Sequence, residues 1–137
     1  MNATLENLFQ YCTLPQTQAN AMIIGNILVA FLLGIIAGYE RSYNWRAAGM
    51  RTYGLVCMAS SAVTVIAGFP DFWYGGLQSL PVAAEPTRVI QGVVTGIGFL
   101  GAGVIMREGL NISGLTTAAS IWSAAAIGVL CGSGFYL

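Results

Sequence analysis

Four long apolar runs separated by polar stretches dominate the chain, and they predict helices over about residues 21–39, 52–69, 88–106 and 114–134. At about 1.5 Å per residue in a helix, each run can cross a hydrocarbon core about 30 Å thick. A buried β-strand also gives a continuous apolar run, but it stops after about 4–8 residues, and a water-soluble helix would show a polar stripe. The pattern therefore predicts an all-α integral membrane protein, a bundle of four transmembrane helices.

The composition favours lipid as the surrounding solvent. Apolar residues make up 56% of the 137-residue chain, and Asp, Glu, Lys and Arg together only 7%, whereas a soluble domain carries about 25% charged residues. Residues 1–19 lack the basic stretch of a cleavable signal, so we expect an outer N-terminal segment followed by a transmembrane domain over residues 20–137. A formal net charge of zero argues against nucleic acid as a partner.

The arginines predict the orientation, since the chain contains no lysine. Four arginines fall in the two polar stretches that share one side of the bilayer, and one falls on the opposite side. The four are Arg41, Arg46, Arg51 and Arg107, and the one opposite is Arg88. Because cytoplasmic loops of membrane proteins carry the excess of positive charge, we expect a multi-pass protein of a bacterial inner membrane with its N-terminus outside.

Glycines spaced four residues apart predict where the helices pack. In lipid, such pairs let two helix backbones approach closely. The pairs are Gly34 and Gly38 in the first helix and Gly92 and Gly96 in the third. In the third helix, Gly96 and Gly103 fall near one face, and Gly98, Gly101 and Ala102 fall on another. Because the glycines of the third helix fall on two of its faces, we expect this helix to be central and contacted from both sides.

The third run also matches the dinucleotide-binding pattern Gly96-x-Gly98-x-x-Gly101. That pattern requires a preceding strand and an acidic residue about 20 residues later, which holds the ribose. Here it lies inside an apolar run, and the acid that follows, Glu108, comes too soon. We therefore assign the glycines to helix packing and expect no nucleotide.

Polar side chains gather at two levels of the predicted bundle, and ionisable groups at membrane depth are costly and often functional. The outer cluster comprises Asn26, Glu85, Arg88 and Gln91. One interpretation is an outward-facing polar pocket. The other is a helix that simply begins at Glu85 and Pro86, where an acid and a proline suit the first turn, with Arg88 at the interface.

The inner cluster comprises Glu40, Arg41, Arg51, Thr116 and Thr117, with Arg46, Arg107 and Glu108 nearby. One interpretation is that these arginines only set the topology and that the acids neutralise them. The other is a functional site, in which Arg51 heads the second helix and pairs with Glu40 across the loop.

The chain offers no catalytic set of residues. It contains no histidine or lysine to act as a base, and no pair of carboxylates at helical spacing. Its three cysteines lack the spacing of metal ligands. We therefore expect no enzyme activity, no cofactor and no metal site.

Three segments resemble the membrane domain of the MgtC/SapB family, and the likeness covers most of the chain from about Asn20 onward. They are GYERSYNWRAAGMRT at 38–52, EPTRVIQGVVTGIGFLGAGVIMREG at 85–109 and GLTTAASIWSAAAIGVLCGSG at 114–134. The residues that match the family's motifs are Glu40 and Arg41; Gly49, Arg51 and Thr52; Glu85, Arg88 and Gln91; and Gly114, Leu115, Thr117, Ala118, Ala119 and Trp122.

This resemblance implies both an architecture and a role. Family members usually continue with a fifth helix and a small cytosolic C-terminal domain, and both are expected to be absent from this chain. The best-known members aid growth when magnesium is scarce and survival of pathogens within macrophages. They are generally regarded as regulators that restrain the membrane ATP synthase.

Three functional hypotheses result. The first is a non-enzymatic regulator that contacts another membrane protein, such as the ATP synthase, through its helices. The second is a small ion transporter or channel, which four short helices could form only as a homo-oligomer. The third is a structural fragment that has no activity alone.

Overall fold

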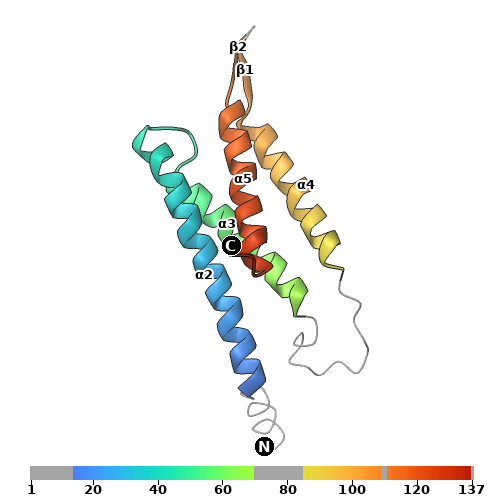
Figure 1. Ribbon diagram of the computed structural model, residues 1–137. Coiled ribbons are helices and arrows are strands. Elements are labelled where there is room, and N and C mark those ends of the chain that lie inside the picture. Colours follow the sequence, from blue (N-terminus) through green and yellow to red (C-terminus); the bar gives the residue numbers. More distant parts are fainter. Residues whose placement is uncertain (1–13, 70–84, 109–110, 137) are drawn as a thin grey trace, which may run out of the picture.

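The computed structural model describes residues 14–69, 85–108 and 111–136, which form four helices and one small hairpin (Figure 1). The elements in chain order are α2 (Leu14–Tyr43), α3 (Met50–Gly68), α4 (Pro86–Val104), β1 (Met106–Glu108), β2 (Asn111–Ser113) and α5 (Leu115–Gly132). Most of the predicted outer segment, residues 1–13, lies outside the described residues, and residues 14–19 already belong to α2.

The described residues contain four helices long and apolar enough to cross a membrane. These spans are Thr17–Tyr43 within α2 and the whole of α3, α4 and α5. The predicted all-α bundle of transmembrane helices is therefore confirmed. The connection between α2 and α3 lies at the same end of the bundle as the β1–β2 hairpin (Figure 1). We call this the arginine end, because Arg41, Arg46, Arg51 and Arg107 belong to these connections or to the helix ends beside them.

Two boundaries differ from the sequence prediction for physical reasons. α2 continues past Tyr39 to Tyr43, because charged residues end a hydrocarbon span without ending a helix, and Arg41 in the last turn complements the helix dipole. Residues 106–108 and 111–113 pair as two antiparallel strands, where the sequence predicted a loop, and Arg107 lies opposite Ile112. Gly114 then leads into α5 with a φ of 86°, a left-handed conformation that glycine adopts without strain.

α3 is the central helix of the single chain, packed on one side by α2 and on the other by α5. Half of its membrane-spanning residues are buried, against 11% for α4. α4 instead lies at the edge of the bundle beside α5 (Figure 1). The prediction that the third helix is central was therefore wrong.

Small residues explain why α3 has neighbours on two sides. A Cβ built on Gly34 of α2 would lie 2.6 Å from the Tyr53 carbonyl oxygen, and one built on Gly38 would lie 2.7 Å from Met50 Cα. On the other side of α3, a Cβ on Gly128 of α5 would collide with the Cys57 carbonyl, and one on Gly132 would lie 2.7 Å from the Ser61 carbonyl oxygen. The helices therefore meet backbone to backbone at two pairs of glycines.

Side chains of α3 add hydrogen bonds to both neighbours. Cys57 donates to the Ala124 carbonyl of α5 at 3.0 Å, and Ser61 donates to the Asn26 carbonyl of α2 at 3.3 Å. Because lipid offers no competing hydrogen bonds, such contacts supplement close packing in holding membrane helices together. Both carbonyls belong to neighbouring helices, so these bonds also fix the register of α3 against α2 and α5.

The glycines of α4 are used differently. A Cβ built on Gly92, Gly96, Gly98 or Gly103 would meet no atom of the described chain within 4 Å, and one on Gly101 would lie 3.7 Å from Ala118 Cβ. Of the two grooves predicted for this helix, the one with Gly96 and Gly103 is therefore open among the described residues, whereas the other is in contact with α5 at Gly101.

Candidate functional site

Arg41 joins two helices at the arginine end. It lies in the last turn of α2, and its Nη2 donates a hydrogen bond of 2.6 Å to Oγ1 of Thr117 in the first turn of α5. Thr117 is 8% exposed, so this bond is shielded from solvent. The Nε atom of Arg41 is also buried, and it has no hydrogen-bond partner among the described residues. The guanidinium is thus held in place with one donor unsatisfied.

Tyr53 and Ser120 make a second connection to the start of α5. The Tyr53 hydroxyl, on α3, donates to Oγ of Ser120. Ser120 Oγ in turn lies 2.8 Å from the Thr116 carbonyl oxygen and 2.9 Å from that of Thr117. The first two turns of α5 are therefore held from α2 through Arg41 and from α3 through Tyr53.

A hollow of about 480 Å³ lies between the end of α2 and the start of α5, and we call it the arginine hollow. Its lining residues are Glu40, Arg41, Asn44 and Arg46 from the α2 side, and Ile112 and residues 114–117 from the α5 side. The Asn44 side chain donates to the Glu40 carbonyl at 3.0 Å, which closes the end of α2. Charged groups and a helix N-terminus thus face one space.

The structure brings four members of the predicted inner cluster together and leaves the fifth apart. Glu40, Arg41, Thr116 and Thr117 line the arginine hollow, whereas Arg51 lines a neighbouring hollow with Ser42 and Gly49. Arg46 lines both. Glu40 and Arg51 therefore do not share the site that the sequence suggested.

Sequence reasoning left Tyr53 and Ser120 out of the candidate site. A signal was available, because the hydroxyl of a tyrosine in an apolar helix needs a hydrogen-bond partner when the ring is buried. Tyr53 is such a residue, only four positions after Gly49, the N-cap of α3. Its partner, Ser120, belongs to a different helix, and a single sequence does not identify that partner.

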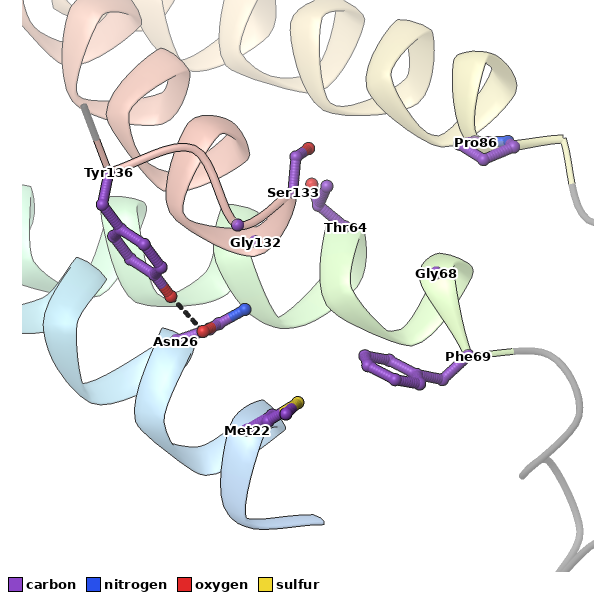
Figure 2. Close-up of a pocket in the computed structure, with 10 residues that line it drawn as sticks. Met22, Asn26, Thr64, Gly68, Phe69, Pro86, Gly132, Ser133 and Tyr136 are labelled. Carbon is purple, nitrogen blue, oxygen red and sulfur yellow. Dashed lines mark hydrogen bonds between the residues drawn. The ribbon is translucent and has the colours of Figure 1, made fainter. Parts of the chain in front are cut away.

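At the opposite end, the predicted outer cluster is divided between two places. Asn26 lines a hollow of about 600 Å³, and its Oδ1 accepts a hydrogen bond from the Tyr136 hydroxyl (Figure 2). Desolvation, with a smaller contribution from nearby Cys131, raises the pKa of Tyr136, so the phenol stays neutral and remains a donor. Thr64 and Ser133 also line this hollow, and α4 contributes Pro86 (Figure 2).

The other three residues of the outer cluster lie on the surface of α4. Arg88 forms an exposed ion pair with Glu85, three positions earlier, and Gln91 is exposed one turn further on. None of the three lines the hollow around Asn26. The reason is the edge position of α4, which turns this face away from α2.

The fold and the arginine hollow define a small multi-pass helical membrane protein whose polar groups gather at the helix ends. The chain belongs to the MgtC family, whose model matches residues 27–137. This range includes the second half of α2, the whole of α3, α4 and α5, and the lining of the arginine hollow.

Curated relatives from two genera share almost half of the aligned residues. Protein MgtC of Salmonella typhimurium (strain LT2) is 48% identical over 110 residues, which are 80% of this chain and 42% of that protein. Protein MgtC of Brucella abortus (strain 2308) is 47% identical over 105 residues, which are 77% of this chain and 40% of that protein. The chain thus spans about two fifths of the length of these relatives. No solved structure matches significantly.

Proposed function

We propose that this protein is a non-enzymatic component of the bacterial inner membrane that regulates another membrane protein through helix contacts. Membership of the MgtC family supports a role in adaptation to low magnesium and in survival inside host cells. The family resemblance also makes the ATP synthase the first partner to test. The single observation that carries the proposal is the open glycine face of α4.

That face has the features of an unused helix interface. Gly92, Gly96 and Gly103 fall near one side of α4, and the ring of Phe99 projects from the same side and is 82% exposed. In lipid, helices associate where small residues allow close approach, because the hydrophobic effect does not drive them together. α2 and α5 use such pairs against α3, whereas the pair on α4 has no partner within the described chain. A helix of another protein would complete it.

The test blocks this face without disturbing the bundle. Gly96→Leu fills the groove of α4, and Gly25→Leu is the matched control, because a Cβ at either position would meet nothing within 4 Å. Both variants should insert and fold normally. We expect Gly96→Leu to abolish crosslinking to a stoichiometric membrane partner and to lose complementation of a magnesium-limited growth defect, while Gly25→Leu retains both.

Two results would overturn the proposal. One is that crosslinking in native membranes recovers no stoichiometric partner for a chain that complements the growth defect. The other is that Gly96→Leu keeps both the partner and the complementation, because contact through the open face of α4 would then be unnecessary.

A further inference from the structure

We propose that the arginine hollow binds a phosphate group. No residue of α4 lines this hollow, so the inference is independent of the helix contact proposed above. Two features carry it: a pair of guanidinium groups, one of them already fixed in place, and an uncapped helix N-terminus that lines the same hollow.

The charged groups around the hollow favour an anion. Arg41 and Arg46 contribute two positive charges, and Glu40 contributes one negative charge. Guanidinium groups present a planar fork of donors that matches two oxygens of a phosphate, and for this reason arginine is common wherever proteins bind phosphate in a fixed geometry. The negative charge of Glu40 repels an anion and so weakens its binding. Removing an arginine and removing Glu40 should therefore change the affinity for phosphate in opposite directions.

The start of α5 adds backbone donors to the same space. Gly114, at the N-cap, makes no side-chain capping bond, and the first backbone N–H to bond back is that of Ala118, to the Gly114 carbonyl at 2.8 Å. The N–H groups of residues 115–117 precede it and have no partner within the helix. These three residues all line the hollow. A helix N-terminus with free N–H groups and a positive dipole end stabilises phosphate.

Arg41 is already held in position at the hollow that it lines. Its Nη2 is fixed on Thr117, so the side chain has little freedom left to lose on binding. The hollow is therefore organised for an acceptor before one is bound.

Two sources can deliver a phosphate group to this place. The arginine end contains the ends of the helices that are long and apolar enough to cross a membrane, so a phospholipid headgroup is within reach, and so is free phosphate in solution. The chemistry of recognition is the same for both, and the experiment therefore has one arm for each source.

The experiment uses the purified chain in neutral detergent with two probes. Equilibrium dialysis measures binding of radiolabelled inorganic phosphate, and native mass spectrometry counts bound phosphatidylglycerol, with diacylglycerol as the lipid that lacks a phosphate. We expect at least one phosphate-bearing probe to saturate at one per chain and diacylglycerol not to bind. Binding of phosphatidylglycerol alone identifies a lipid site, and binding of inorganic phosphate identifies a site for free phosphate.

Three single variants test the residues. Arg46→Gln should weaken binding about tenfold, because a hydrogen bond to a charged group is lost, and Glu40→Gln should strengthen binding, because the opposing charge is removed. Arg51→Gln is the control, since it removes the same charge from the same end of the bundle but lies outside the arginine hollow. A gain with Glu40→Gln cannot come from misfolding, because misfolding would weaken binding.

The proposal is overturned if neither phosphate-bearing probe saturates. It is also overturned if Arg51→Gln weakens binding as much as Arg46→Gln, because the effect would then be the general positive field of this end. Equal binding of diacylglycerol and phosphatidylglycerol would likewise exclude a phosphate site.

Discussion

Hydrogen bonds to two hydroxyl side chains of α5 hold the start of this helix in place. The arginine end is therefore more rigid than it would be if its charged side chains were all free in solvent. Arg41 reaches Thr117 from α2, and Tyr53 reaches Ser120 from α3. Hydrogen bonds between membrane helices contribute only about 0.6 kcal/mol on average, since the unfolded state in the membrane also finds partners. Their importance here is geometric, because they fix the position of the helix N-terminus that lines the arginine hollow.

Tyr53→Phe tests the contribution of one of these bonds. The substitution removes the donor to Ser120, but Ser120 keeps its bonds to the carbonyls of its own helix, so no buried group is left unsatisfied. We expect the free energy of unfolding to fall by about 0.5–1 kcal/mol, measured by titrating sodium dodecyl sulfate into neutral micelles. Tyr39→Phe is the control, because Tyr39 is 62% exposed and removing its hydroxyl should leave the free energy of unfolding unchanged. Equal stability of the two variants would show that the bond does not contribute.

The helices were predictable from the sequence, because a run of apolar residues long enough to span a bilayer has few other uses. Which helices are neighbours was not predictable. Pairs of glycines four residues apart occur in α2, α4 and α5. The spacing shows that a groove exists, but the partner of that groove is a tertiary property. Gly128 and Gly132 had the same signal as Gly34 and Gly38, and they pack on the central helix α3.

The candidate sites show the same limit. Four residues of the inner cluster come together because the two helix ends that carry them lie at one membrane surface, and the arginines in the sequence indicate which helix ends share that surface. These residues are Glu40, Arg41, Thr116 and Thr117. Asn26 is separated from Gln91 because the spacing of residues along one helix does not determine which other helix faces it. Depth in the membrane is thus readable from sequence, whereas position around the bundle is not.

Glycine substitutions test the packing of whole helices. Gly34→Ala on α2 places a methyl group against backbone atoms of Tyr53 and Gly54, which cannot move unless the helices separate. Overpacking costs about 1–3 kcal/mol, and this exceeds the gain of about 1 kcal/mol from replacing glycine by alanine in a helix. We therefore expect the free energy of unfolding to fall, by up to about 2 kcal/mol, measured in the same detergent titration.

Gly25→Ala on the same helix is the matched control, because a Cβ there would meet nothing within 4 Å. Only the gain in helix propensity applies at this position, so its stability should stay the same or rise. If Gly34→Ala and Gly25→Ala gave the same stability, the backbone contact between α2 and α3 would not limit the packing of the bundle.

The orientation of the whole molecule decides which compartment the arginine hollow faces. The α2–α3 connection and the β1–β2 hairpin share one end of the bundle, and the arginines gathered there predict that this end is cytoplasmic (Figure 1). Cysteine labelling in intact cells tests this in a Cys12→Ser background, since Cys57 and Cys131 are buried free thiols that a bulky reagent does not reach.

Two exposed positions report the two ends. A membrane-impermeant thiol reagent should label Thr87→Cys, at the start of α4, in intact cells, and should label Ala47→Cys, after α2, only once the cells are permeabilised. The reverse pattern would place the arginine hollow outside, where phosphate would reach it from the periplasm. Labelling of both positions in intact cells would mean that the chain inserts in both orientations, and four arginines against one would then be too weak a bias to fix the topology.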